Sequence, residues 1–196
     1  MAALAGSSRL SRGAVFRVAY KLFTHHLGSA WLRRLCEGDD ALADVFRSNL
    51  SPTSWRPLEL LLTAVDRSTP VTEKRIELAR ALGRAVMTVT FARFFGADPA
   101  SLSPLALLRA AGSCWSRYHS WGHLEIDGSD GGAAAAVTLL DSPGDPVVCA
   151  LVAGHLIRIA ELAGATEVSI DETACARYGG SACRFELAWA APGRGR

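Results

Sequence analysis

The chain of 196 residues is 49% apolar and 8% aromatic, which is enough to fill the core of one domain. Its formal charge of +2 includes a basic excess in the first half, but these side chains are spread singly along the chain, which disfavours a nucleic-acid-binding surface. No apolar run approaches the roughly 18 residues of a membrane span and no signal-peptide pattern opens the sequence, so we expect a cytoplasmic protein.

The first part of the sequence predicts helices. Residues 1–12 and the tail 191–196 are small, polar or basic, and we expect both to be flexible. Between them we expect a single domain, residues 13–190, whose helical half covers residues 13–120. Glycine and proline mark the points where helices break or begin. The predicted helices cover residues 14–36 with a break at Gly28, 40–48, 57–65, 72–95, and 103 to 115 or 118.

After Gly122 the pattern changes from helical to strand periodicity. Alternating side chains predict strands at residues 123–127, 133–140, 167–171 and 183–189, and a longer apolar stretch predicts a helix over 146–162. The half from residue 121 to residue 190 therefore has the order β-β-α-β-β. We predict an α+β fold in which an N-terminal helical layer packs on a small antiparallel sheet.

Four residues of this half form the pattern C-x22-E-x2-C-x7-C: Cys149, Glu172, Cys175 and Cys183. Three thiolates and one carboxylate suit a tetrahedral zinc ion better than magnesium or calcium. The last three residues lie within one predicted hairpin, and Cys149 lies in the first turn of the preceding helix. The alternative is that Cys149 is a small buried apolar residue, and that the other two cysteines are free or occasionally form a disulfide.

The segment from Cys149 to Trp189, CALVAGHLIRIAELAGATEVSIDETACARYGGSACRFELAW, resembles the C-terminal half of the 4-vinyl reductase-type domain. The domain also forms the sensor part of sigma-54-dependent activators that respond to aromatic compounds, and its fold is more distantly related to heme-NO-binding domains and TRAPP subunits. The resemblance implies a zinc site at Cys149, Glu172, Cys175 and Cys183. Because four protein ligands leave no open position, such a zinc ion has a structural role.

The resemblance also implies an apolar cavity between the central helices and the sheet. The positions that carry aromatic rings in the phenol sensors are Ala153, Ile159 and Ile170 here, which disfavours phenol as the ligand. The alternative is that the lining residues only fill the core. The expected lining residues are Met87, Phe91, Phe94, Trp115, Tyr118, Ala153, Leu156, Ile159 and Ile170.

His155 lies in the middle of a predicted helix and is the candidate heme ligand by analogy with the heme-binding relatives. A lone histidine in such a helix is more often a hydrogen-bonded core or surface residue, so heme is not expected. Zinc is the expected cofactor.

We therefore predict a stand-alone bacterial sensor or regulatory domain, braced by zinc, that holds a small hydrophobic molecule and signals to a protein partner. A dimeric assembly module of TRAPP-like fold is the alternative, and a homodimer is expected in either case. An enzyme related to tetrapyrrole vinyl reductases is a third reading. It is disfavoured because the sequence has no glycine-rich dinucleotide loop and no catalytic constellation.

Overall fold

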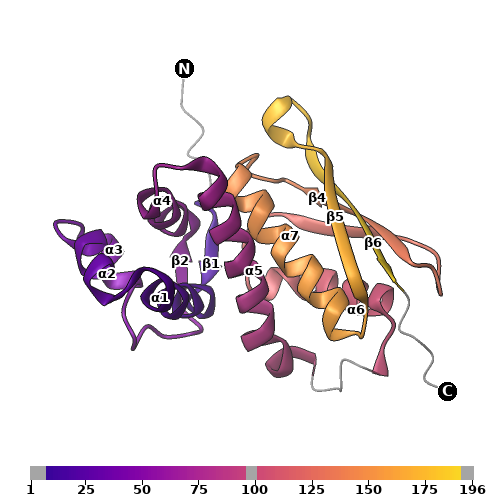
Figure 1. Ribbon diagram of the computed structural model, residues 1–196, viewed down its shortest axis with the longest axis horizontal. Helices are drawn as coiled ribbons and strands as arrows, with labels where there is room; N and C mark the ends of the chain where they lie inside the picture. Colours follow the sequence, from indigo (N-terminus) through magenta and orange to yellow (C-terminus); the bar gives the residue numbers. More distant parts are fainter. Residues whose placement is uncertain (1–7, 96–100, 191–196) are drawn as a thin grey trace.

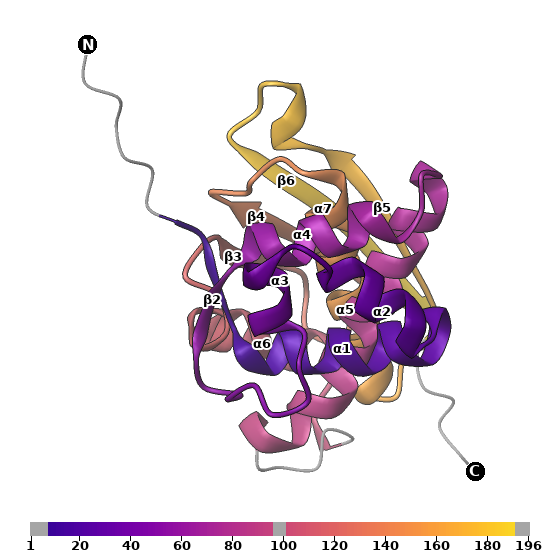
Figure 2. The ribbon, with the colours of Figure 1, turned by 90° about the vertical axis from the view of Figure 1, so that its left-hand side faces the viewer.

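The computed structural model describes residues 8–95 and 101–190, except the side chains of residues 92–95. It has the predicted α+β fold, with helices in the N-terminal part and an antiparallel sheet in the C-terminal part (Figure 1). The first helices, which face the viewer in Figure 2, are α1 (Gly13–Leu27), α2 (Ser29–Cys36), α3 (Asp40–Val45) and α4 (Leu58–Ser68). Gly28 separates α1 from α2 with a φ of +83°, a conformation that glycine adopts without strain.

Two short strands that the sequence analysis did not predict tie the N-terminus to the molecule. β1 (Leu10–Arg12) pairs antiparallel with β2 (Trp55–Pro57). Leu10–Arg12, which belong to the stretch 1–12 that was expected to be flexible, thus form a paired strand. Residues 1–7 and 191–196 lie outside the described part of the chain, and the single domain over residues 13–190 stays a prediction.

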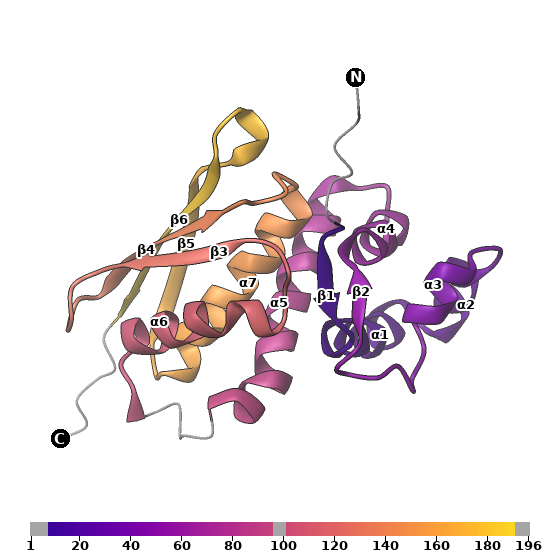
Figure 3. The ribbon, with the colours of Figure 1, turned by 180° about the vertical axis from the view of Figure 1, so that it is seen from behind.

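Two long helices form the centre of the molecule. α5 (Thr72–Phe95) and α7 (Pro146–Leu162) lie side by side (Figure 1, Figure 3). The Asp145 side chain caps α7 by accepting hydrogen bonds from the backbone N–H groups of Val147 and Val148. Most residues of α7 are buried, because α5 covers one side of this helix and the sheet covers another. An apolar helix of this kind belongs to the core.

The main sheet has four antiparallel strands in the order β3-β4-β6-β5. The strands are β3 (His123–Asp127), β4 (Ala134–Leu140), β5 (Thr166–Ala174) and β6 (Ala182–Ala190). Helix α6 (Pro104–Cys114), followed by the 3-10 turn η2 (Trp115–Arg117), leads into β3. In β6, Phe185 and Leu187 are buried, whereas Arg184 and Glu186 are exposed, as expected for a sheet with one face on the core.

None of the described helices is long and apolar enough to span a membrane.

Candidate functional site

Three cysteine sulfurs and one carboxylate converge where α7 meets the β5–β6 hairpin. Cys149 lies in the first turn of α7 and Glu172 near the end of β5. Cys175 follows β5, and Cys183 is the second residue of β6. One ligand atom from each of the four side chains lies within 4.8 Å of the others. The structure thus brings together the four residues that the sequence suggested as metal ligands.

The three sulfur atoms of this cluster lie within 4 Å of one another. Cys149 Sγ lies 3.5 Å from Cys183 Sγ and 3.9 Å from Cys175 Sγ, and the latter two sulfurs are 3.8 Å apart. These distances exceed the roughly 2.05 Å of a disulfide bond, so all three residues are thiols. Around a tetrahedral cation with metal–sulfur bonds of about 2.3 Å, the sulfur atoms lie about 3.8 Å apart.

Two thiols of this cluster, those of Cys149 and Cys175, have raised pKa values in the metal-free protein. Burial raises the pKa of Cys149 far above its ordinary value, and the hydrogen bond and charge of Glu172 act in the same direction. Burial also raises the pKa of Cys175. A cation that binds here therefore has to displace protons from sulfur.

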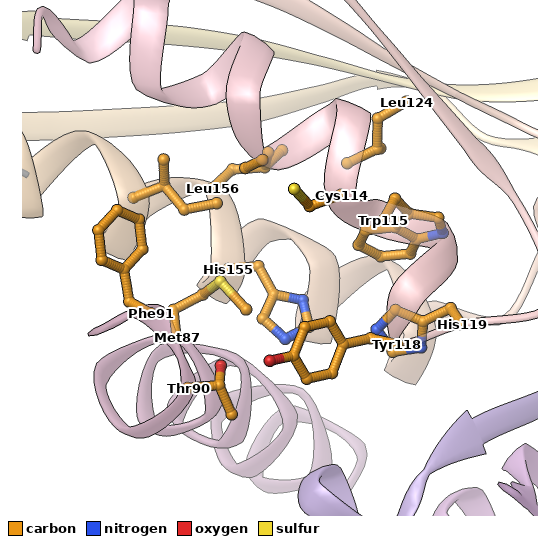
Figure 4. Close-up of a pocket in the computed structure, with 12 residues that line it drawn as sticks. Met87, Thr90, Phe91, Cys114, Trp115, Tyr118, His119, Leu124, His155 and Leu156 are labelled. Carbon is orange, nitrogen blue, oxygen red and sulfur yellow. The ribbon is translucent and has the colours of Figure 1, made fainter. Parts of the chain in front are cut away.

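A second candidate site is a cavity of about 40 Å³ between α5, α6, η2 and α7 (Figure 4). This volume holds a few water molecules. Six of the residues that the sequence analysis expected around a ligand line it: Met87, Phe91, Trp115, Tyr118, Leu156 and Ile159. Six further residues, which were not expected from the sequence as lining residues, complete this wall: Thr90, Ala111, Cys114, His119, Leu124 and His155.

Three expected lining residues are not among those that line this cavity. Ala153 and Ile170 line a separate pocket of about 110 Å³ beside Cys149 and Glu172. The side chain of Phe94 lies outside the described residues. The expected ligand set is therefore divided between two places, because Ala153 lines a pocket with residues of β5, whereas Leu156 and Ile159 line the cavity with residues of α6.

The polar centre of the cavity is His155, which is 1% exposed. Within the part of the chain that the structure describes, neither of its ring nitrogens has a hydrogen-bond partner. Its imidazole lies among the lining side chains, with Trp115 and Tyr118 on one side and Met87 on the other (Figure 4). Burial lowers the pKa of His155 to about 4, so the imidazole is neutral at physiological pH.

A second buried histidine, His119, lies beside His155 and has a defined polar partner. The ring centroids of the two histidines are 6.1 Å apart. His119 Nδ1 shares a hydrogen bond of 2.9 Å with Ser11 Oγ, which also accepts a hydrogen bond from Trp121 Nε1. Burial, and to a lesser extent the neighbouring His155, lower the pKa of His119 well below its ordinary value. One ring nitrogen of His119 is thus engaged by a side chain, whereas neither ring nitrogen of His155 is among the described residues.

No model of a known protein family matches the sequence, and no curated protein matches it significantly. Solved structures match along nearly the whole chain. An H-NOX protein from K. algicida in the Fe(II) unliganded state superposes with a TM-score of 0.71 at 9% identity, and covers 94% of this chain and 100% of its own. An H-NOX protein from Shewanella oneidensis in the Fe(II)NO state superposes with a TM-score of 0.68 at 15% identity. This match covers 92% of the present chain and 99% of the Shewanella protein.

The chain has the H-NOX fold. This finding corrects the resemblance to the 4-vinyl reductase-type domain, because the structural neighbours are H-NOX proteins. The resemblance rested on one helix and one hairpin, a layout that the H-NOX fold also provides. The relationship that the sequence suggested only as a distant one, to heme-NO-binding domains, is the one that the fold supports.

The cofactor and function derived from that resemblance are corrected with it. Zinc was the expected cofactor and heme was not expected, but the neighbours with the H-NOX fold are described in iron-bound states or in studies of heme distortion. The zinc-braced sensor for a hydrophobic molecule, the TRAPP-like module and the reductase-related enzyme all depended on the same family assignment.

Proposed function

We propose that this chain is a sensor domain that binds heme, with the imidazole of His155 as a ligand of the iron. The observation that carries this proposal is the buried imidazole whose two nitrogens lack a hydrogen-bond partner among the described residues. Buried polar atoms in proteins almost always have partners, and the exceptions call for a ligand or another functional reason. The similarity in fold to H-NOX proteins supports heme as that ligand.

The chemistry of the cavity suits this group. A neutral imidazole is a common iron ligand, and the low pKa of His155 keeps it neutral without competition from protons. The apolar side chains of Met87, Leu156 and Trp115 would contact the faces and edges of a flat macrocycle. When bound, heme supplies an iron centre that can take up a small gas molecule.

The cavity must widen to admit such a ligand. Its volume of about 40 Å³ is far below that of ordinary cofactor sites, which are on the order of several hundred Å³. Thr90 and Tyr118 form the wall between the cavity and an adjoining groove. We expect ligand binding to displace this wall, and therefore to shift α5 relative to η2. A protein partner that binds one of these two arrangements more tightly than the other can detect such a shift. This proposed role involves no catalysis.

Titration of the metal-free protein with hemin tests the proposal. We expect a shifted Soret band that saturates at one heme per chain. His155→Ala should weaken binding by at least about tenfold, because the iron loses its protein ligand, and added imidazole should restore the wild-type spectrum. His123→Ala, which removes an exposed histidine of β3, is the matched control. The proposal is wrong if wild type does not bind hemin, or if His155→Ala binds it with the wild-type spectrum.

We infer separately that Cys149, Glu172, Cys175 and Cys183 bind a thiophilic divalent cation with a structural role. The supporting observation is that all four ligand atoms lie within 4.8 Å of one another, with sulfur separations suited to tetrahedral coordination. The cation would join the first turn of α7 to the β5–β6 hairpin. Homodimerisation, a cytoplasmic location and the identity of the partner stay predictions.

Cobalt(II) is a suitable probe of this cluster because its absorption reports both ligand type and geometry. Titration of the reduced protein should give thiolate-to-cobalt charge-transfer bands and the intense visible bands of a tetrahedral site, with one ion per chain. Cys149→Ser and Cys175→Ser should each remove or weaken these bands. Cys36→Ser, which changes a thiol outside the cluster, should leave them unchanged. Weak bands typical of octahedral cobalt in the wild type would exclude the site.

A further inference from the structure

A basic groove of about 470 Å³ lies next to the cavity that contains His155. Its wall comes from β1, the first turns of α1, the loop before β2, α5 and η2. Thr90 of α5 and Tyr118 after η2 line both the cavity and the groove. The two spaces are therefore separated by these side chains rather than by a layer of secondary structure.

The groove carries positive charge without compensation. Arg12, Arg17, Lys21 and Arg117 line it, and its wall contains no carboxylate. Eight ion pairs join other arginines of the described residues to Asp or Glu, but none of them includes these four cations. Uncompensated cations that face one concave surface attract an anion.

Part of this charge is held in place. The Arg12 guanidinium lies 3.9 Å from the centre of the Trp55 ring and donates hydrogen bonds to the backbone carbonyls of Arg117 and Thr53. Arg17 and Lys21 are one helical turn apart on α1 and therefore share a face of that helix. The ordered Arg12 can therefore contact a carboxylate with little further loss of side-chain entropy, and Arg17 and Lys21 add two more cations from one helix face.

The groove also has an apolar element. Val89 of α5 lines it and is 54% exposed, which is unusual for a large apolar side chain of this protein. Apolar surface beside cations, next to an apolar cavity, is the pattern expected for a ligand that is apolar at one end and anionic at the other.

We propose that the cavity and the basic groove are two parts of one site for a carboxylate-bearing amphipathic ligand. The apolar body lies against His155, and the carboxylates lie in the groove, bound by Arg17, Lys21 and Arg117 beside the ordered Arg12. This inference deepens the proposed function and rests on it, because heme carries two carboxylates on one edge of an otherwise apolar macrocycle. The basic groove then sets the direction in which the macrocycle enters.

The test compares hemin with its dimethyl ester, in which both carboxylates are blocked, on the metal-free protein of 196 residues. We expect the ester to bind about tenfold more weakly than hemin or worse, since charge-assisted hydrogen bonds are lost. Arg17→Glu/Lys21→Glu should weaken hemin binding by a similar factor and leave ester binding unchanged. Arg33→Glu/Arg34→Glu makes the same charge change on α2, outside the groove, and should bind both ligands like wild type.

The outcomes separate this inference from the proposed function. If wild type binds hemin and its ester equally well, heme binding stands and the role of the groove is excluded. The same conclusion follows if the groove variant binds hemin as well as the α2 control does. If wild type binds neither ligand, both proposals fall. The far-ultraviolet circular dichroism of each variant, compared with wild type, ensures that weak binding reflects the lost charges and not unfolding.

Discussion

At the scale of single residues, His155 reduces the stability of the fold that contains it. An unpaired buried polar group costs about 1–3 kcal/mol, and an apolar side chain of similar size would avoid this cost. Residues 147–154 of α7 carry no polar side chain, and the nearest charged one after His155, Arg158, is bonded to Thr88 and Glu161. A side chain kept at the expense of stability is typical of a binding site.

The lowered pKa of His155 predicts how the stability of the ligand-free protein depends on pH. The unfolded state takes up a proton near pH 6.5, whereas the folded state does so only near pH 4. Stability is therefore lost as the pH falls through this window, by about 2 kcal/mol at pH 5 for this group alone. His119 contributes in the same direction, because its pKa is also lowered.

Urea denaturation at pH 7.5 and pH 5 measures this effect. In His155→Leu the loss of stability between the two pH values should be smaller than in wild type by about 2 kcal/mol, because the variant cannot take up that proton on unfolding. His123→Gln, on the exposed side of β3, should retain the wild-type difference. Equal losses in wild type and His155→Leu would show that His155 does not titrate as its burial indicates.

The two candidate sites differ in how far the sequence could predict them. Cys175 and Cys183 flank a hairpin turn, and Glu172 and Cys149 lie at the ends of neighbouring elements, so strand pairing and chain order alone suggested that they meet. Nothing comparable was available for His155. Helical periodicity indicates which side of α7 a residue occupies, but the absence of a hydrogen-bond partner depends on neighbours from α5 and η2 that lie far away in the sequence.

At the scale of secondary structure, the contact between α5 and α7 depends on glycine. A Cβ atom on Gly83 would lie 2.0 Å from the carbonyl oxygen of Leu151, and one on Gly154 would lie 2.1 Å from that of Arg80. The helices are also joined by Arg84, whose Nη2 lies 2.8 Å from both carboxylate oxygens of Glu161. Because α5 and α7 both line the cavity, their separation controls its shape.

Gly154→Ala should therefore destabilise the protein by about 2 kcal/mol or more, since the obstructing atom belongs to the backbone of α5 and cannot rotate away. Thermal unfolding followed by circular dichroism measures the change. Gly180→Ala is the matched control, because its added Cβ would meet no atom closer than 3.6 Å. A variant at Gly154 with wild-type stability would show that the helices are farther apart than described.

The longer elements were predictable because each has its own pattern. The apolar stripe of α5, the alternation in β6 and the Asp145-Pro146 start of α7 are local signals of a helix or strand. β1 and β2 were missed because three residues are too few to show an alternation. The order of the strands in the sheet depends on contacts between distant segments, so it could not be predicted from these patterns.

At the scale of the whole molecule, the arrangement of all elements corrected what one segment suggested. The segment from Cys149 to Trp189 contains a helix, a strand and a hairpin, which are compatible with more than one family. The order and packing of the elements over residues 8–190, with the gap at 96–100, match the H-NOX fold almost from end to end. A short motif could suggest a metal site, but the fold could be recognised only from the whole architecture.

The strand formed by Leu10–Arg12 has a consequence for anyone who prepares a shortened form of this protein. The backbones of Ser11 and His119 form an isolated antiparallel β-bridge. The backbone N–H of Arg12 donates a hydrogen bond of 2.8 Å to the carbonyl oxygen of Tyr118. A version trimmed to begin at Gly13, where the first helix starts, would keep every helix and the four-stranded sheet. It would nevertheless lose Ser11, which contacts His119, and Arg12, one of the four cations of the groove. Failure of such a fragment to bind a ligand would therefore say little about the chain that contains these residues.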